Sequence, residues 1–310
     1  MSIPGSRGVS HGLDTDYCRI FAAAVPGDVA KVRFVATTTQ QRFTALRSGE
    51  VDFLARATTW IVSRDTSVGL VFAGINLYDG QDFLVKRSLG VKSGKELDGA
   101  TIYVLPCTTS EQNLQDWFRS NGLEFAPVVI EDANTILQTF EAGRCDVLSN
   151  DMTDLTGYRS SLGSRQDDYV LLPEIISKEP LGPLVRQGDW RWFTIIKWVH
   201  FALVEAEDLG VTAATVEQSK QSKNPEIRRR LGLKGEFGKT IGLDPAWAAQ
   251  AVAAVGNYGE IWERNQASLG VKRGVNRLWR DGRASVCAPV PTIRHGSTHA
   301  RRLIPGRLGA

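Results

Sequence analysis

Short apolar runs alternate with amphipathic segments over most of the chain, a pattern typical of alternating strands and helices. Apolar positions at helical spacing predict a helix over 14–25, which Asp14 or Thr15 can cap and a Pro-Gly pair ends. The next apolar run predicts a strand over 31–35. This order is that of an α/β protein.

A second helix and strand follow. Thr39 can cap a helix that carries Phe43 and Leu46 on its inner face, and Gly49 can end it in a left-handed conformation. The segment 51–55 is short and apolar, as the strands of parallel sheets are.

Farther along, the same pattern returns. Strands are predicted over 100–105, 125–130 and 145–149, and helices over 111–120 and 134–142. Residues 45–54 can be aligned with residues 139–148. In both, an apolar helix end is followed by Gly, a spacer, an apolar residue, Asp and an apolar strand. We infer two βαβ lobes of similar build, although such helix–Gly–strand joints are also alike in unrelated α/β proteins.

The remaining segments suggest how the lobes connect. Extended, Gly-flanked stretches at 78–86 and 181–187 are the expected hinge. An aromatic-rich helix over 189–208 should return to the first lobe, and further helices are expected at 224–231 and 244–255, each with a Pro near its start. We interpret His200, inside the aromatic helix, as a packed core residue.

Composition and charge exclude several classes of protein. The 310 residues carry a formal charge of +3, but five arginines and no acidic residue lie after position 282, so the first 282 residues carry a net charge of −2. A near-neutral body of this kind argues against nucleic-acid binding. The basic segment 283–310 is expected to be a disordered tail, with a nucleic-acid or lipid contact as the alternative. No apolar run is long enough to span a bilayer.

Cysteine spacing and the first residues add two expectations. The four cysteines lie at 18, 107, 145 and 287, without metal-ligand spacing, so no metal site is expected. The opening MSIPGSRG has no charged segment followed by an apolar one, so it predicts no export signal.

The chain lacks phosphate-loop, dinucleotide-binding, zinc-protease and nucleophile-elbow motifs. What remains suits a zwitterion. Arg64 can take a carboxylate through two hydrogen bonds, Thr108 and Thr109 precede a helix whose N-terminus favours anions, and Asp151 can accept an ammonium group. Each also has a structural explanation: a solvated loop arginine, a capping box that uses Glu111, and an aspartate that caps a helix.

Long stretches of the chain resemble the solute-binding proteins of the polar amino-acid type, in particular the general L-amino-acid-binding subfamily of ABC importers. The resemblance covers roughly residues 12 to 280, and the stretches that carry it are GLDTDYCRIFAAAVPGD, RFTALRSGEVDFLARATTWIVSRDTS, GVKSGKELDGATIYV, PVVIEDANTILQTFEAGRCDVLSNDMT, VLLPEIISKEPLGPLVRQGDW and VGNYGEIWERN.

The resemblance implies a type II periplasmic-binding-protein fold, with two lobes of mostly parallel sheet flanked by helices and a hinge between them. Residues 1–82 and 185–282 would form lobe 1, and residues 83–184 would form lobe 2. It also implies a periplasmic monomer that hands an L-amino acid to the membrane permease of an ABC importer. No catalysis, cofactor or nucleic acid is expected.

Site residues follow from the same resemblance. Arg64 matches the arginine that binds the ligand carboxylate, and Thr59 matches a hydroxyl residue that hydrogen-bonds the ligand. The backbone carbonyl of Ala57 and the carboxylate of Asp151 match the groups that meet the ammonium. Thr109, with Thr108 before it, matches the loop that closes on the carboxylate from the second lobe.

The sequence also departs from the family pattern. It is expected to begin after the family's signal peptide, first strand and a loop that supplies an aromatic wall of the site. Cys107 replaces a Gly and would strain the loop if that position has a positive φ. Tyr103 replaces a cysteine, which leaves Cys145 free or able to reach Cys107. Two alternatives therefore remain open: a remnant that binds nothing, and a dehydratase of cyclic acids with Glu111 as general acid.

Overall fold

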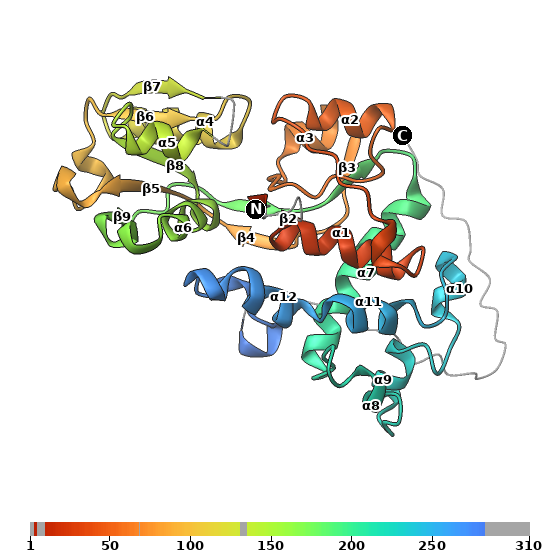
Figure 1. The fold of residues 1–310 in the computed structure, drawn as a ribbon. Helices are drawn as coiled ribbons and strands as arrows, with labels where there is room; N and C mark the ends of the chain where they lie inside the picture. The colour runs from red at the N-terminus through yellow and green to blue at the C-terminus, as the bar shows by residue number, and fades with distance from the viewer. Residues whose placement is uncertain (1–2, 5–9, 68, 131–134, 283–310) are drawn as a thin grey trace, which may run out of the picture.

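The structure, a computed structural model, describes residues 3–4, 10–67, 69–130 and 135–282, so the predicted tail 283–310 lies outside the described residues. Two lobes stand side by side and are joined by extended strands (Figure 1). The connection includes an antiparallel pair formed by β4 (Leu77–Asp79) and β10 (Glu179–Leu181). This connecting pair overlaps the expected hinge segments 78–86 and 181–187 only at their first residues; the remainder of each segment forms a strand within one of the lobes.

Lobe 2 is built on a sheet in the order β7-β6-β8-β5-β9. Its strands are β5 (Gln81–Lys86), β6 (Thr101–Val104), β7 (Ala126–Val129), β8 (Val147–Asp151) and β9 (Tyr169–Leu171). Strand β6 runs parallel to β7 and β8, whereas β5 is antiparallel to β8 and β9. The expectation of mostly parallel sheets is therefore wrong in detail: among the described strands, parallel pairing is confined to β6, β7 and β8.

Helices cover both faces of this sheet because apolar side chains alternate along its strands. Residues Phe83 and Val85 of β5 pack in one cluster with Leu114 and Phe118 of α4 (Thr109–Ser120). Between them, Leu84 points to the other face and packs with residues of two further helices. These are α5 (Ile136–Glu141) and α6 (Met152–Ser161).

Lobe 1 contains less sheet than the sequence predicts. Its strands β3 (Leu70–Phe72) and β11 (Leu184–Arg186) form one antiparallel pair, next to α2 (Arg42–Ser48) and α3 (Val62–Ser67). The predicted strand over 31–35 is not formed, and Phe34 within it is 44% exposed. Of the predicted strand over 51–55, only an isolated bridge between Leu54 and Leu184 is present.

The absence of the strand over 31–35 has a physical cause. An extended segment is stable as a strand only when its backbone groups find hydrogen-bonding partners. In the described part of lobe 1, no strand lies alongside residues 32–38, so their apolar composition does not produce a sheet. The short β1 (Ile3–Pro4) pairs with β2 (Ser10–His11) instead.

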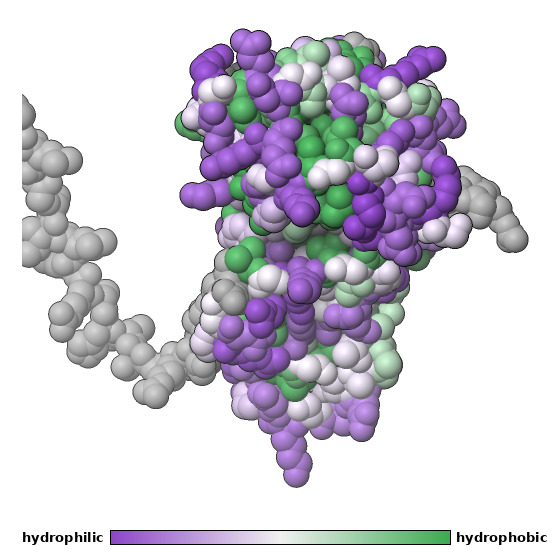
Figure 2. Space-filling view, turned by 90° about the vertical axis from the view of Figure 1, so that its left-hand side faces the viewer, coloured by the Kyte–Doolittle hydropathy of each residue, from purple (hydrophilic) through white to green (hydrophobic). Residues whose placement is uncertain are grey.

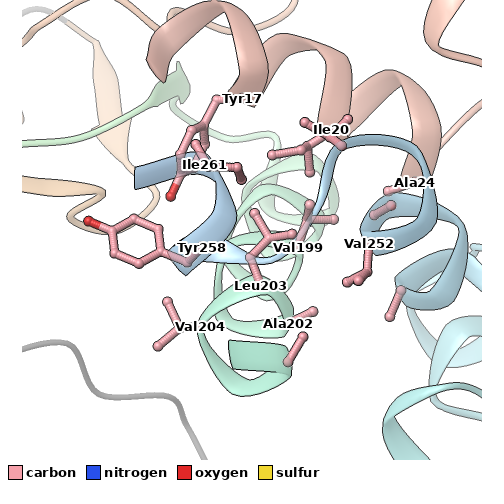
Figure 3. Packing of buried hydrophobic residues seen from close by; sticks show 14 of the residues in the cluster. Tyr17, Ile20, Ala24, Val199, Ala202, Leu203, Val204, Val252, Tyr258 and Ile261 are labelled. Carbon is pink, nitrogen blue, oxygen red and sulfur yellow. The ribbon is translucent and has the colours of Figure 1, made fainter. Parts of the chain in front are cut away.

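A helical layer completes lobe 1. Side chains from α1 (Leu13–Ala24), α7 (Trp190–Asp208), α11 (Trp247–Val255) and α12 (Tyr258–Asn265) converge in the largest core cluster (Figure 3). The shorter helices are α8 (Val216–Ser219), α9 (Pro225–Arg230) and α10 (Phe237–Ile241). Single 3-10 turns occupy Val29–Lys31, Arg87–Leu89, Gly94–Glu96, Gly163–Asp168, Ala267–Leu269, Gly274–Asn276 and Trp279–Asp281.

The predicted helix ends agree with the structure in part. Gly49 ends α2 with a φ of 81°, in the left-handed region. The cap predicted for the first helix is wrong, because α1 begins at Leu13 after Gly12, without a side-chain cap. The buried carboxylate of Asp14 instead accepts a hydrogen bond from the backbone N–H of Ala57, at 3.2 Å.

The visible surface is mainly hydrophilic, as expected for a chain of ordinary globular composition. Figure 2 shows hydrophilic residues over much of the visible face, with hydrophobic residues gathered between them. Among the described residues, no helix is both long and apolar enough to cross a membrane.

His200 is a core residue, as the sequence predicts. Its Nδ1 lies 2.8 Å from the hydroxyl oxygen of Tyr17. The centres of the two rings are 5.9 Å apart, and their planes are tilted by 34°. Burial lowers the pKa of His200 to about 4. The folded protein therefore keeps this imidazole neutral under mildly acidic conditions in which the unfolded chain protonates it.

We expect His200 to make the protein less stable as the pH falls. The folded pKa of His200 lies below the unfolded value. The neutral imidazole therefore contributes fully to the unfolding free energy above about pH 6.5, and this contribution falls by about 3 kcal/mol in total as the pH is lowered towards 4. The difference in unfolding free energy between the native protein and His200→Asn, measured by urea titration at several pH values, should change over this window. A difference that stays constant with pH would contradict the assignment.

Cys107 has a φ of 62° and is the only residue other than glycine with a positive φ in the described part of the chain. An L-residue with a Cβ is strained there, so the sequence expectation for this loop is confirmed. Cys107 is exposed and Cys145 is buried, and both are free, so the alternative disulfide between them is not formed.

Cys107→Gly should stabilise the protein by roughly 1 kcal/mol, because relief of the left-handed strain exceeds the added chain entropy of glycine. Cys107→Ala is the matched control: it removes the thiol and keeps the Cβ, so it should give no such gain. Chemical denaturation of the three proteins measures the effect. Equal gains from Gly and Ala would show that the thiol, and not the backbone, is responsible.

Candidate functional site

The connecting pair brings the predicted site residues of the two lobes together. Thr59 forms a bridge with Leu181, and the backbone N–H of Trp60 donates to the carbonyl of Pro180 at 2.8 Å. This places the hydroxyl of Thr59 3.1 Å from the hydroxyl of Thr109, at the N-terminus of α4 in lobe 2. The two predicted residues therefore meet across the interlobe cleft.

Arg64 lies in α3, next to Thr59. Its side chain is not that of a solvated loop arginine, since the residue is only 8% exposed and its Nη1 donates to the carbonyl of Thr59 at 3.0 Å. Burial lowers the pKa of Arg64, and the nearby carboxylates of Glu179 and Asp151 act against that shift. The guanidinium is therefore a desolvated positive charge that responds to acidic groups of the hinge and of lobe 2.

Asp151 ends β8 and is 6% exposed. Its side chain does not cap the helix that follows, which argues against the purely structural explanation. The pKa of Asp151 is raised well above its usual value, first by burial and then by the charges of Asp79, Asp154 and Glu179. This end of the cleft therefore holds several carboxylates that a cation would stabilise.

Two other predicted residues, Thr108 and Ala57, form hydrogen bonds within their own lobes. The hydroxyl of Thr108 accepts from the backbone N–H of Glu111 at 3.2 Å and donates to the carbonyl of Leu105 at 2.7 Å. The carboxylate of Glu111 accepts from the backbone N–H of Cys107 at 3.1 Å, so these residues form the helix cap that was the structural alternative. The carbonyl of Ala57, expected to meet an ammonium, accepts from Arg42 at 3.4 Å.

Arg42 was missed at the level of sequence. It begins α2, is 2% exposed, and donates to the hydroxyl of Thr58 at 3.2 Å. Burial, followed by the charges of Arg64 and Arg56, lowers the pKa of Arg42 to about 9. Its position on the polar side of a short helix gave no signal, because the groups that its guanidinium contacts, Ala57 and Thr58, lie in a later segment of the chain. The guanidinium carbon also lies 4.8 Å from the centre of the Phe43 ring.

Glu179 was also missed. It lies in β10, is 2% exposed, and its carboxylate accepts hydrogen bonds from Thr59, Thr109, Asn113 and Ser177. A charged residue within an extended segment was the available signal, but sequence position alone did not show that the segment passes between the lobes.

One cavity of the molecule lies apart from the predicted site residues. A cavity of about 250 Å³ is lined by aromatic and amide side chains that include Trp60, Tyr78, His200 and Tyr258, and by none of the predicted site residues. Within the described ranges, no group of three or more His, Cys, Asp or Glu side chains is arranged to hold a metal ion. The charged and hydroxyl groups at the interlobe cleft thus form the candidate site.

Comparison with known proteins reveals close relatives. The chain is 47% identical over 292 residues to the general L-amino acid-binding periplasmic protein AapJ of Rhizobium johnstonii, which covers 93% of this chain and 85% of that protein. It is 50% identical over 283 residues to the glutamate/glutamine/aspartate/asparagine-binding protein BztA of Rhodobacter capsulatus, with 90% and 83% covered. No protein-family model matches.

Solved structures give the same answer at the level of the fold. A periplasmic binding protein of an ABC transporter from Brucella ovis, with glutathione bound, superposes with a TM-score of 0.90 at 47% identity, over 93% of this chain and 92% of that one. An ancestral arginine-binding protein bound to arginine has a TM-score of 0.58 at 23% identity, over 70% and 91% of the chains. At that identity the second likeness shows the fold alone.

The acidic end of the cleft should destabilise the protein while no ligand is bound. Asp151→Asn is expected to raise the unfolding free energy by roughly 1–2 kcal/mol at pH 7, because it removes a buried charge that faces other carboxylates. The raised pKa means that this gain disappears at acid pH, where the carboxyl is protonated in both states. Urea titration at pH 7 and at about pH 3, below the unfolded aspartate pKa of about 3.9, measures both effects.

Asp116→Asn provides the control, since the side chain of Asp116 is 77% exposed and should respond little at either pH. Destabilisation of Asp151→Asn at pH 7 would show that the carboxylate is compensated in the folded protein.

Proposed function

The chain belongs to the general L-amino-acid-binding periplasmic proteins that serve ABC transporters, and from this we propose that it binds an L-amino acid in its interlobe cleft. Relatives of this kind are solute-binding proteins, so the chain is not an enzyme. The observation that carries the proposal for the site is the burial of opposite charges, Arg64 and Asp151, at the cleft without an ion pair between them in the described structure.

A zwitterion complements these charges. Its carboxylate can take two parallel hydrogen bonds from the guanidinium of Arg64, with Thr59 and Thr109 as further donors. Its ammonium can approach Asp151, where it would lower the cost of burying that carboxylate beside Asp79. Each charge of the protein would then be offset by a charge of the ligand.

Closure of the lobes strengthens these interactions. With the lobes together, Thr59 meets Thr109, and the hydroxyl of Thr39 donates to the carbonyl of Pro106 at 3.1 Å. A closed cleft excludes water, and ion pairs are stronger where the effective dielectric constant is low. Hinge closure of two lobes around a ligand is a general mechanism that fits this arrangement.

The rest of the proposed role follows from the family. We infer that the protein works in the periplasm, as a monomer, and delivers its ligand to the membrane permease of an ABC importer. The relatives are named as periplasmic and as ABC transporter-binding proteins, which supports this role. The dehydratase alternative has no support among the relatives that are 44–50% identical, which are named as amino-acid-binding proteins.

Isothermal titration of the purified protein against the twenty common L-amino acids tests the proposal. At least one should bind with a stoichiometry of one per chain. Silence across the panel, from a protein shown by circular dichroism to be folded, would contradict the proposed function.

Arg64→Ala should weaken binding by roughly 2–5 kcal/mol, because it leaves a buried ligand carboxylate without its charged partner. Asp151→Asn should weaken binding similarly at the other end of the ligand. Arg47→Ala is the matched control: Arg47 is an exposed arginine on neighbouring α2 and should leave the affinity unchanged. Normal binding by either site variant would show that the residue is wrongly assigned.

A further inference from the structure

A second cavity lies in the helical layer of lobe 1, between α7, α9, α10 and α11. Its volume is about 190 Å³, and its walls include Trp198, Phe237, Ile241 and Trp247, with Arg229 among the polar residues that line it. In Figure 1, α9 and α10 lie at the end of this layer that is remote from lobe 2. None of the residues assigned to the interlobe cleft lines this cavity, so the two places are separate.

One side of the cavity is built of closely packed backbone. A Cβ on Gly232 would overlap the carbonyl oxygen of Pro245, and a Cβ on Gly238 would overlap that of Asp244. Since a residue with a side chain cannot approach so closely, both positions require glycine. The segments on either side of α10 therefore pack backbone to backbone, and the cavity is a preformed part of the fold.

Arg229 brings an unpaired positive charge to this cavity. Its side chain makes no hydrogen bond or ion pair with the described part of the chain, and its Nε is buried. The neighbouring Arg230 differs, because its guanidinium pairs with the buried carboxylate of Glu205. A guanidinium beside apolar side chains is best satisfied by a carboxylate that takes two of its N–H groups at once.

Trp247 adds a second hydrogen-bond donor. The residue is 5% exposed, and its indole N–H has no hydrogen-bonding partner within the described ranges. The Cδ1 atom of this indole, which is bonded to Nε1, packs against Gly238, another residue that lines the cavity. An indole N–H can only donate, and no aspartate or glutamate is among the described lining residues. The cavity therefore suits an anion and has no carboxylate to receive an ammonium group.

The charge around the cavity has the same sign. Residues 228–239 contain five basic side chains and one acidic side chain. Two of the five are paired, Lys239 with Glu236 and Arg230 with Glu205. The remaining basic side chains leave a net positive charge beside the cavity, which attracts anions.

The size and the walls of the cavity restrict the ligand further. Cavities that hold drug-sized ligands have volumes of roughly 300–1,000 Å³, so about 190 Å³ suits a molecule with a single ring. Walls from Trp198, Phe237 and Trp247 favour an aromatic ring, which can stack on them or meet them edge to face. A zwitterionic amino acid fits poorly, since its ammonium would lie near Arg229 without a carboxylate to offset it.

We propose that this cavity is a second binding site, for monocyclic aromatic carboxylates of the phenylacetate type. The ring lies among the three aromatic side chains, and the carboxylate pairs with Arg229. The site is independent of the amino-acid site in the interlobe cleft. Because the ligand contacts residues from four helices, its binding stabilises the helical layer of lobe 1.

Isothermal titration of the full chain with phenylacetate tests the site. One molecule should bind per chain, at least about tenfold more tightly than phenylacetamide, which has nearly the same shape but no charge for Arg229. Phenylacetate should also raise the melting temperature more than phenylacetamide does at the same concentration. No binding of phenylacetate, or equal affinity for the two compounds, would overturn the proposal.

Arg229→Gln should lower the affinity for phenylacetate at least about tenfold and leave the affinity for phenylacetamide unchanged. Arg228→Gln is the matched control, because Arg228 lies in the same helix with the same charge but does not line the cavity. It should leave both affinities unchanged. Circular dichroism checks that both variants fold. Equal losses in the two variants would reveal a general attraction to positive charge and would rule out a site at Arg229.

Arg64→Ala distinguishes this site from the interlobe cleft. Phenylacetate should bind to this variant as tightly as to the native protein, because Arg64 does not line the second cavity. Loss of binding in Arg64→Ala, with binding kept in Arg229→Gln, would place phenylacetate in the interlobe cleft and refute the second site. These titrations contain no amino acid, so failure of the proposed amino-acid binding would leave their result unaffected.

Discussion

Desolvated charge at the interlobe cleft is the constraint on which the rest of the structure depends. Arg42 and Arg64 lie on one side and Asp151 on the other, all buried, and burial shifts the pKa of each toward its neutral form. Folding would not place such groups out of water unless something offset the cost. The hydrogen bonds of the arginines to backbone carbonyls do so in part, and a zwitterionic ligand would do so more completely.

The strands and helices of lobe 2 could be predicted well because their sequence signals lie within short segments of the chain. Alternating residues of β5 separate cleanly into two clusters, and the sequence Thr108-Thr109-Ser110-Glu111 is a helix cap in the structure as in the pattern. The strand predicted over 31–35 of lobe 1 is absent because a strand forms only beside a neighbouring strand. The apolar residues around Phe34 favour a β-strand, but whether another strand lies beside them to accept hydrogen bonds depends on the whole fold.

The site shows the same division between local and distant information. Arg64, Thr109 and Asp151 were singled out by their chemistry and position in the sequence, and the resemblance to known sequences added Thr59. The structure brings Thr59 and Thr109 within hydrogen-bonding distance. Arg42 and Glu179 were not found, because the groups that they contact are distant in the sequence and leave no periodic pattern. Relatives that are 47–50% identical establish the family, whereas the part played by each side chain depends on contacts that identity does not measure.

The loop at Cys107 has a practical consequence. Burial raises the pKa of Cys18 to about 12 and of Cys145 to about 11, which makes both thiols poor nucleophiles at neutral pH. Cys107 is exposed, and two residues farther on Thr109 touches the opposite lobe. Of the three cysteines in the described part of the chain, Cys107 is therefore the one that a thiol-reactive dye would label, and the emission of a dye held next to Thr109 would report ligand binding.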